Sequence, residues 1–540
     1  MNSKRSKFSN FLINKLINIK SLTLILVTFF IVIRIPYLGF SNFNTDSYKW
    51  KQRIYDFGTG VFTLDLEKTN QKYHPGVTLL WIGTFAVKFH TLMFDYVYNS
   101  QVSTNSSEYV FSLNFYQILF VSIACALLLG VFYRFLIKIF DPIKSFAILM
   151  IFSLEPFFMG LTTTLHLDGI LSLLIINTLI TFYLYLTKSS KKYLIYSAIF
   201  FGLALLTKTT AVLFLPILFI SYILHNTKNF REVLKDGLVF VGIFIGIYFL
   251  VWPAMWVAPF NTLSYVLKGI TVGSDDHLQL YFGSFVSDPG PAFYLLVFII
   301  KTPIYIFPAV LLALYRKLNT TYTKYTFEFY LLMSSILYLI EITIPSKKLD
   351  RYILPTMILL SFFALSYLYD AFKGKIIYLF IFNLLYVFYL SFDFFSYYNP
   401  LVGGLTTNVY AIEPKWAFGQ KELTQFFKAE IEENKLELFA ENEADVSRVR
   451  ENNNKLIVAM PEKYFTQLKD YLRYIDSFAV INEIKPDARR ASYFLFPVWE
   501  DTSSEFKERY SLEYYKTIKV RGVDAYIIYK KVKKTDDTKN

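Results

Sequence analysis

Ionisable side chains stand at the ends of long apolar runs in this chain of 540 residues. Asp46 in "FNTDSYKW" follows the first run, and His166 and Asp168 lie in "LHLDG" between two later runs. Carboxylates and imidazoles can take a proton from a hydroxyl, whereas lysine and arginine can hold a phosphate leaving group. The side chains that could share this chemistry are Asp46, His74, His166, Asp168, Lys208, Lys301, Lys347 and Arg351.

Several of these residues also have a purely structural explanation. Asp46 and Asp168 suit helix starts, where a carboxylate accepts hydrogen bonds from free backbone N–H groups. His74 precedes a Pro-Gly pair that can begin a helix. Lys208 can snorkel to the membrane surface, and Lys347 can face anionic lipid headgroups. These alternatives stay open at the level of the sequence.

The composition indicates a membrane protein. Apolar residues make up 54% of the chain and aromatic residues 19%, more than soluble proteins usually carry. A helix needs about 20 mainly apolar residues to cross a bilayer, which predicts about eleven spans. They lie near 21–35, 114–137, 145–163, 168–187, 192–207, 209–225, 237–254, 291–315, 326–344, 352–371 and 375–393. Glu155 and Lys301 fall inside two of them, where an ionisable group is either functional or satisfied by a neighbouring helix.

The basic residues between the runs predict the topology. Connections rich in lysine and arginine belong on the cytoplasmic side by the positive-inside rule, which places the basic N-terminus, 1–20, inside. Residues 21–393 then form the membrane domain, and residues 394–540 lie on the outer face. The long first outer loop, 36–112, is amphipathic in places and is expected to be partly helical along the membrane surface.

The segment "IPSKKLDRYILP" is an exception to this charge pattern. Its three basic residues, Lys347, Lys348 and Arg351, lie in an outer connection, where the rule predicts few bases. An anion-binding site at the membrane surface would explain them, and lipid-linked phosphate is the obvious anion.

From about residue 400 onward the apolar runs stop and charged residues become dense. The stretch "NNNKLIVAMPEKYFTQLKDYL" predicts a strand followed by a helix, and "TIKVRGVDAYIIYK" predicts a hairpin that turns at Arg521-Gly522. The predicted fold class is therefore an α-helical polytopic membrane protein, N-terminus inside and C-terminus outside, with a small α/β extracytoplasmic domain.

Other classes of site are unsupported. Cys125 is the only cysteine, so the chain can form neither an internal disulfide nor a cysteine metal site. No Walker loop, GxGxxG or HExxH motif occurs. The net charge of +13 is scattered between apolar runs, which disfavours nucleic-acid binding. "SDDHLQL" holds adjacent Asp275, Asp276 and His277, a weak metal pattern, so a divalent metal ion stays open as a cofactor.

Five segments resemble the bacterial and archaeal branch of the GT-C glycosyltransferases, which is similar to protein O-mannosyltransferases and to the lipid A aminoarabinose transferase. They occur in order between about residues 30 and 420 and read "YHPGVTLLW", "GLALLTKTTAVLFLP", "SDPGPAFY", "KKLDRYILP" and "SYYNPLVGG". The resemblance implies a GT-C fold and a polyprenyl-phosphate sugar donor. It implies that Asp46 is the base, that Asp168 is a second acid, and that Lys208 and Arg351 meet the phosphate.

The resulting hypothesis is a plasma-membrane glycosyltransferase that acts on the outer face. It would transfer a sugar, with inversion, from a polyprenyl-phosphate donor to a hydroxyl of a protein, lipid or glycan. Lys347 and Lys301 are further candidates for phosphate binding, and His74 and His166 for substrate binding. The alternative is a transporter or flippase of lipid-linked sugars, which predicts internal repeats and ionisable residues near the membrane midplane. A non-catalytic scaffold is a third reading.

Overall fold

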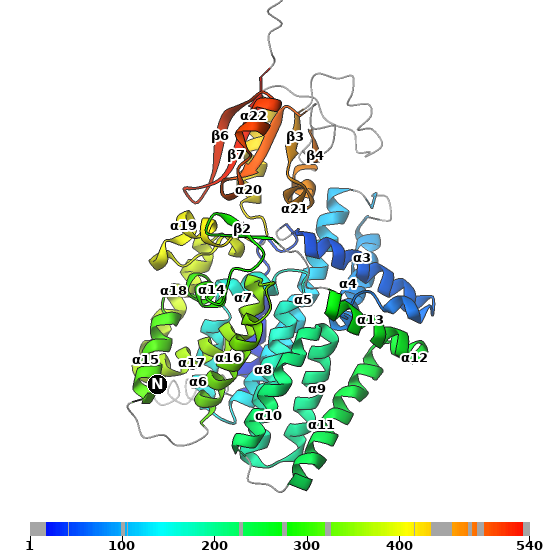
Figure 1. Ribbon diagram of the computed structural model, residues 1–540, viewed down its shortest axis with the longest axis vertical. Coiled ribbons are helices and arrows are strands. Elements are labelled where there is room, and N and C mark those ends of the chain that lie inside the picture. The colour runs from blue at the N-terminus through cyan, green and yellow to red at the C-terminus, as the bar shows by residue number, and fades with distance from the viewer. Residues whose placement is uncertain are drawn as a thin grey trace, which may run out of the picture.

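The computed structural model separates a large helical part from a small sheet domain at one end of it (Figure 1). It describes residues 18–40, 43–98, 103–104, 106–225, 230–272, 278–318, 326–414, 416–433, 456–473, 478–482 and 491–532. Most of the basic N-terminus and the "SDDH" residues therefore lie outside the described residues, as do 533–540 of the charged C-terminal tail. The predicted fold class, helical with a small C-terminal α/β domain, is confirmed.

Every predicted span falls on a helix or on a pair of helices. The buried α8 (Asp168–Lys188) lies at the centre and packs against α5 (Ser107–Leu136), α9 (Lys191–Thr207) and α17 (Leu354–Phe372). The remaining helices of this bundle are α2 (Ile19–Val32), α6 (Pro142–Phe152), α7 (Pro156–Thr162), α10 (Phe214–His225), α11 (Phe230–Val251), α14 (Phe293–Lys301), α15 (Ile306–Leu318), α16 (Phe327–Thr343) and α18 (Ile376–Tyr389).

Two of the predicted spans are broken helices. The helices α6 and α7 are bent by 77° at a break that contains Glu155, and α14 and α15 are bent by 111° just after Lys301. Within the described residues, five helices are long and apolar enough to cross a membrane, or up to seven spans if each bent pair counts as one. Others, such as α2, are shorter, so the total of about eleven spans stays a prediction.

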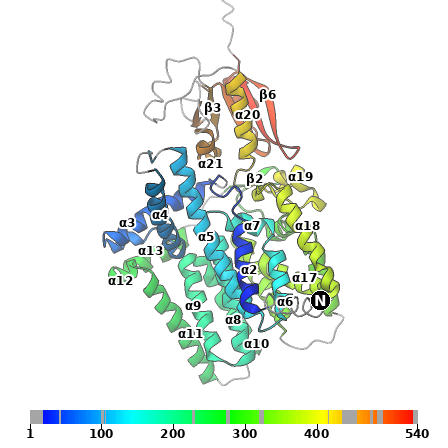
Figure 2. The same ribbon diagram turned by 180° about the vertical axis from the view of Figure 1, so that it is seen from behind.

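The first outer loop is more ordered than an interfacial connector. It contains α3 (Thr45–Phe62), the 3₁₀ turn η1 (Leu66–Thr69) and α4 (Val77–Tyr98). The helix α3 is amphipathic as predicted, but α4 has the length and apolarity of a membrane span. Figure 2 shows α3 and α4 beside α5, close to α12 (Ala254–Val257) and α13 (Pro259–Val272). This group of helices flanks the end of the bundle that faces the sheet domain.

The C-terminal domain is a mixed five-stranded sheet with helices packed on it. Its strands β3 (Leu456–Met460), β4 (Phe478–Asn482), β5 (Tyr493–Pro497), β6 (Leu512–Val520) and β7 (Val523–Lys531) are arranged in the order β4-β3-β5-β7-β6. The strand β3 is parallel to β4 and β5, and β7 is antiparallel to β5 and β6. The predicted hairpin is confirmed, because Arg521 and Gly522 have φ values of 48° and 81° at its tip, as a tight hairpin turn requires.

The sheet domain rests on the segment that begins α3. Its helix α21 (Glu462–Arg473) places the Tyr471 ring against Phe43, with ring centroids 5.3 Å apart, and the Tyr471 hydroxyl accepts the Phe43 N–H at 3.4 Å. The Tyr48 hydroxyl of α3 also contacts the Asp470 carboxylate. These contacts hold the residues on both sides of Asp46 and so link the two parts of the protein at the candidate site.

Candidate functional site

The helix start at α3 positions Asp46. Asn44 is the N-cap, and its side chain accepts the Ser47 N–H at 2.8 Å, so the capping role that the sequence allowed for Asp46 is filled by another residue. The Ser47 hydroxyl donates to the Leu165 carbonyl at 3.4 Å. This bond ties the start of α3 to the segment that carries His166.

The segment between α7 and α8 positions His166 and Asp168. Asp168 is the first residue of α8, and the side chains of both residues are at most 5% exposed. The His166 Nδ1 lies 3.1 Å from Asp168 Oδ2, and its Nε2 lies 3.6 Å from Asp46 Oδ2. The imidazole therefore stands between the two carboxylates.

Two cations from distant parts of the chain complete this group. Lys208, at the C-terminal end of α9, donates from Nζ to Asp168 Oδ1 at 2.7 Å. Arg351 lies in the 3₁₀ turn η3 (Asp350–Ile353) and bridges both carboxylates. Its Nε is 3.1 Å from Asp168 Oδ2, and its Nη2 is 3.3 Å from Asp46 Oδ2. We call Asp46, His166, Asp168, Lys208 and Arg351 the charge cluster.

The two carboxylates of the charge cluster have different surroundings. Asp168 faces a histidine, a lysine and an arginine, and its side chain is 4% exposed. The side chain of Asp46 is 24% exposed. A carboxylate that is enclosed by cations is held as an anion and organises its neighbours, whereas the more exposed Asp46 can meet a substrate hydroxyl. This arrangement suits Asp46 as the base and Asp168 as the anchor.

A cleft of about 260 Å³ opens beside the charge cluster. His74, Thr209, Lys347 and Tyr352 line its polar part. The Tyr352 ring centroid lies 4.3 Å from the Lys208 ammonium, which connects the cleft to the cluster. Apolar side chains complete its wall, namely Val212, Leu213 and Ile342. The cleft thus combines polar side chains near the buried Lys208 with apolar side chains.

His74 sits at the junction of the cleft and the charge cluster. Its Nδ1 lies 2.7 Å from the Thr209 hydroxyl. Burial, together with the positive charge of Lys208, lowers the pKa of His74 to about 3. The imidazole is therefore neutral at physiological pH and can exchange hydrogen bonds without adding charge.

The remaining predicted cations are placed differently. Lys347 lines the cleft. Its neighbour Lys348 is 1% exposed and donates to Asp288 at 2.7 Å and to the Pro345 carbonyl at 2.8 Å, so it fastens the "SDPG" loop. Lys301 is also buried. Its ammonium donates to the Tyr397 carbonyl at 3.2 Å and lies 3.3 Å from the Tyr398 ring centroid.

No described contact joins Lys301 to the charge cluster, and its contacts explain it as part of the packing where α14 ends. The motif "SYYNP" supplies those contacts. Asn399 of the same motif donates from its side chain to the Ile299 carbonyl at 3.0 Å. The segment therefore packs against the end of α14, where the helix breaks before α15.

Two residues at this site were not predicted from the sequence. Tyr352 follows Arg351 directly, and its position in the "LDRY" motif could have indicated it. Trp416 lies far along the chain, in the connection between α19 (Gly404–Ala411) and α20 (Gln420–Glu433). Its ring centroid is 5.4 Å from that of His166 and 5.7 Å from the Arg351 guanidinium carbon. No local sequence pattern marks Trp416, because only the tertiary fold brings it to the charge cluster.

Metal binding can be examined in the described part of the chain. There, no group of three or more His, Cys, Asp or Glu side chains is arranged to hold a metal ion. The candidate ligands Asp275, Asp276 and His277 lie outside the described residues.

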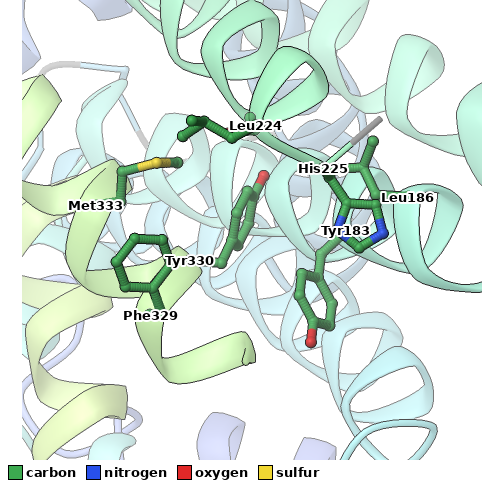
Figure 3. A pocket seen from close by; sticks show the side chains of 8 residues that line it. Tyr183, Leu186, Leu224, His225, Phe329, Tyr330 and Met333 are labelled. Atoms are coloured by element: carbon green, nitrogen blue, oxygen red, sulfur yellow. The ribbon is translucent and has the colours of Figure 1, made fainter. Parts of the chain in front are cut away.

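A second cavity lies away from the charge cluster, between α8, α10 and α16 (Figure 3). Its volume is about 20 Å³, enough for one water molecule. Leu224, Tyr330 and Met333 point toward one another there, and Tyr183 and His225 also line the cavity. This cavity is too small for a sugar or a lipid headgroup.

Residues 104–256 match the family of dolichyl-phosphate-mannose-protein mannosyltransferases. This match confirms the resemblance to the GT-C glycosyltransferases. The matched region contains His166, Asp168 and Lys208 of the charge cluster, whereas Asp46 and Arg351 lie outside it. No curated protein matches the chain.

Solved structures of GT-C enzymes are similar over most of the chain at low identity. ArnT from Cupriavidus metallidurans bound to undecaprenyl phosphate is 12% identical, with a TM-score of 0.49, over 95% of this chain and 98% of that one. The Archaeoglobus fulgidus oligosaccharyltransferase in its apo form is 12% identical, with a TM-score of 0.43, over 92% of this chain and 73% of that one.

Proposed function

We propose that the protein is a membrane glycosyltransferase that moves a sugar from a polyprenyl-phosphate donor to a hydroxyl acceptor. The observation that carries the proposal is the charge cluster beside a cleft that has both polar and apolar lining residues. A lipid-linked sugar phosphate needs these three features together, namely a base, cations for the phosphate and an apolar path for the lipid. The family match over residues 104–256 supports the same class of reaction.

In the proposed reaction Asp46 accepts the proton of the acceptor hydroxyl, whose oxygen attacks the anomeric carbon of the sugar. The bond from that carbon to the phosphate oxygen breaks, and the lipid phosphate leaves with the bonding electron pair. Arg351, Lys208 and Lys347 stabilise its negative charge. Attack on the face opposite to the leaving group inverts the anomeric centre. Asp168 and His166 hold the cations and Asp46 in position.

The topology is part of this proposal. With the N-terminus in the cytoplasm and about eleven spans, the charge cluster and the sheet domain lie on the outer face of the plasma membrane. The acceptor, whether protein, lipid or glycan, would then approach from outside the cell. The sheet domain packs on the start of α3, so it stands where an acceptor would enter.

Transport of lipid-linked sugars is the second candidate, because broken helices with buried ionisable residues also occur in transporters. The two broken pairs carry Glu155 and Lys301. Both are occupied by local contacts, since Glu155 accepts the Phe157 and Phe158 N–H groups and Lys301 donates to the Tyr397 carbonyl. These contacts favour a structural role for the breaks, and therefore the transferase.

Turnover by purified protein tests the proposal. Wild-type protein should release polyprenyl phosphate from at least one member of a panel of radiolabelled polyprenyl-phosphate sugars, offered with hydroxyl acceptors. Asp46→Asn should keep the thermal stability and lose at least about a hundredfold in rate, because general-base catalysis contributes factors of this size. Asp65→Asn is the matched control, since Asp65 is a surface carboxylate that pairs with Lys68.

Three outcomes of this experiment are informative. Loss of turnover in folded Asp46→Asn alone supports Asp46 as the base. Equal turnover by the wild type and Asp46→Asn would show that Asp46 is structural. Movement of intact donor across a vesicle membrane, without release of polyprenyl phosphate, would replace the transferase with the transporter.

A further inference from the structure

Trp416 covers the charge cluster from the side of the sheet domain. Its side chain is 3% exposed. The ring lies edge-on to His166 and to Phe395, with centroid distances of 5.4 and 4.7 Å, and near the Arg351 guanidinium. A residue from beyond α18 thus contacts two members of the charge cluster.

The indole nitrogen of Trp416 is buried and has no hydrogen-bond partner among the described residues. Other tryptophans of the chain satisfy theirs with protein oxygens: Trp81, Trp252, Trp256 and Trp499 all donate to a described acceptor. A buried donor without an acceptor is destabilising, so such groups are rare in folded proteins and call for an explanation.

A second buried donor without a partner lies beside it. Arg351 Nη1 also has no hydrogen-bond partner within the described part of the chain, although the same guanidinium reaches both carboxylates through its other nitrogens. Two such donors, one in the charge cluster and the other on the ring that packs against it, indicate that a ligand supplies the missing oxygens. The pair combines a cation with an uncharged N–H group, which suits a ligand that carries both an anionic and a neutral oxygen.

Three hydrogen bonds hold the backbone that follows Trp416, two of them to the sheet domain and one to Asp393. The Ala417 N–H donates to Gln467 Oε1 of α21 at 2.7 Å, and the Phe418 carbonyl accepts from the Tyr526 hydroxyl at 2.7 Å. The Gly419 N–H donates to Asp393 at 2.9 Å. A donor fixed before the ligand arrives loses little freedom on binding, which favours specific recognition.

We infer that Trp416 is a substrate-binding residue whose indole N–H donates to a hydroxyl of the donor sugar. The inference rests on the proposed function and extends it, because it assigns a sugar contact to the segment between α19 and α20, which the sheet domain holds. Lys208, Lys347 and Arg351 already provide cations for the phosphate, whereas an uncharged N–H suits an uncharged hydroxyl. The sugar is bonded to that phosphate, so its hydroxyls lie within reach of a ring adjacent to Arg351.

The test compares the binding of lipid phosphate with and without a sugar. The probes are undecaprenyl phosphate and its mannosyl and aminoarabinosyl derivatives, with dissociation constants measured in detergent for the wild type and Trp416→Phe. The phenyl ring keeps aromatic contact with His166 and Phe395 and removes the N–H. Trp256→Phe is the matched control, because Trp256 is 57% exposed and donates to the Phe249 carbonyl.

We expect Trp416→Phe to weaken binding of the preferred sugar-bearing lipid about tenfold and to leave undecaprenyl phosphate binding within twofold of the wild type. Equal losses for both lipids, or no loss for either, would overturn the inference. Wild-type protein that binds the sugar-free lipid as tightly as every sugar-bearing one would overturn it too. Binding as expected, without any transfer, would instead leave Trp416 in place and refute the proposed transferase.

A second variant tests the same hydrogen bond in case Trp416→Phe does not fold. Genetic incorporation of benzothienylalanine at position 416 keeps the bicyclic shape and replaces the N–H by sulfur. The same selective loss of sugar-dependent binding is expected. Monodeoxy sugar derivatives, each lacking one hydroxyl, complete the test. The derivative that lacks the hydroxyl bound by Trp416 should bind equally well to the wild type and to this variant. The reason is that loss of the hydroxyl and loss of the indole N–H remove the same hydrogen bond.

Discussion

At the scale of single residues, the buried charges of the charge cluster are stabilised by ion pairs with one another. Asp168 is enclosed by His166, Lys208 and Arg351 at distances of 2.7 to 3.1 Å. Breaking a buried ion pair by removing one partner typically costs about 3–5 kcal/mol. Substitutions of Asp168 are therefore expected to disturb folding, whereas the more exposed Asp46 is the better probe of chemistry.

His74 leads to a prediction about pH. Its pKa is lowered to about 3 in the folded protein, whereas an unperturbed histidine has a pKa of about 6.5. The unfolded chain therefore binds a proton below pH 6.5 that the folded protein rejects. Between pH 7.5 and pH 5 this difference should remove about 2 kcal/mol of stability from the wild type.

Thermal unfolding of the wild type and His74→Gln across this pH range measures the effect. The glutamine can still exchange a hydrogen bond with Thr209, but it does not titrate. The wild type should lose more stability than the variant as the pH falls to 5. Parallel curves for the two proteins would show that His74 is protonated in the folded state.

At the scale of elements, much of the fold could be predicted from the sequence. Apolar runs located every helix of the bundle because a membrane span must satisfy its backbone internally. The bends at Glu155 and Lys301 were not predicted. The first has a local cause, because Glu155 caps α7 and Pro156 begins that helix. The second depends on tertiary contacts, because the "SYYNP" segment packs against the end of α14. The outer loop was predicted as interfacial, yet α4 packs on α5 and has the length and apolarity of a membrane span.

Glu155 provides the prediction at this scale. Its carboxylate accepts N–H groups at the start of α7, which requires an acceptor oxygen but no proton transfer. Glu155→Gln should therefore stay within about 1 kcal/mol of the wild-type stability and keep its turnover. Glu155→Ala should lose about 1–2 kcal/mol with the cap.

Thermal unfolding and donor turnover of both Glu155 variants decide between the two roles that the sequence left open. Abolished turnover in a stable Glu155→Gln protein would make Glu155 functional. Wild-type turnover in that variant would show that the break between α6 and α7 has a structural role, namely to position α8 and its first residue, Asp168, beside the cleft.

At the scale of the whole molecule, the site is shared between two parts of the chain. Asp46, Asp168, Lys208 and Arg351 could be predicted because they lie at the ends of apolar runs, and the family resemblance implied a role for each of them. Trp416 could not be found in this way. Its place depends on how the sheet domain packs on α3 and on the segment that follows α18, where Arg521 donates to the Ser396 hydroxyl at 2.7 Å. Such contacts between distant segments leave no periodic signal in the sequence.

The sheet domain should therefore influence substrate binding through Gln467, which is 1% exposed and accepts the Ala417 N–H. Gln467→Leu removes this acceptor and frees the Trp416 segment, at a cost of about 1–3 kcal/mol in stability. Binding of mannosyl or aminoarabinosyl undecaprenyl phosphate, whichever the wild type prefers, should weaken up to about tenfold. Thr466→Ala, next to Gln467 on the same helix, is the control.

A double-mutant cycle separates this effect from a general loss of stability. If Gln467 acts by holding Trp416, Gln467→Leu should weaken binding in the wild type but hardly at all in Trp416→Phe, where the indole N–H is already gone. Additive losses would mean that Gln467 acts by another route. A coupled loss would establish that the sheet domain shapes the sugar site through one short segment, although its sheet lies outside the helical bundle.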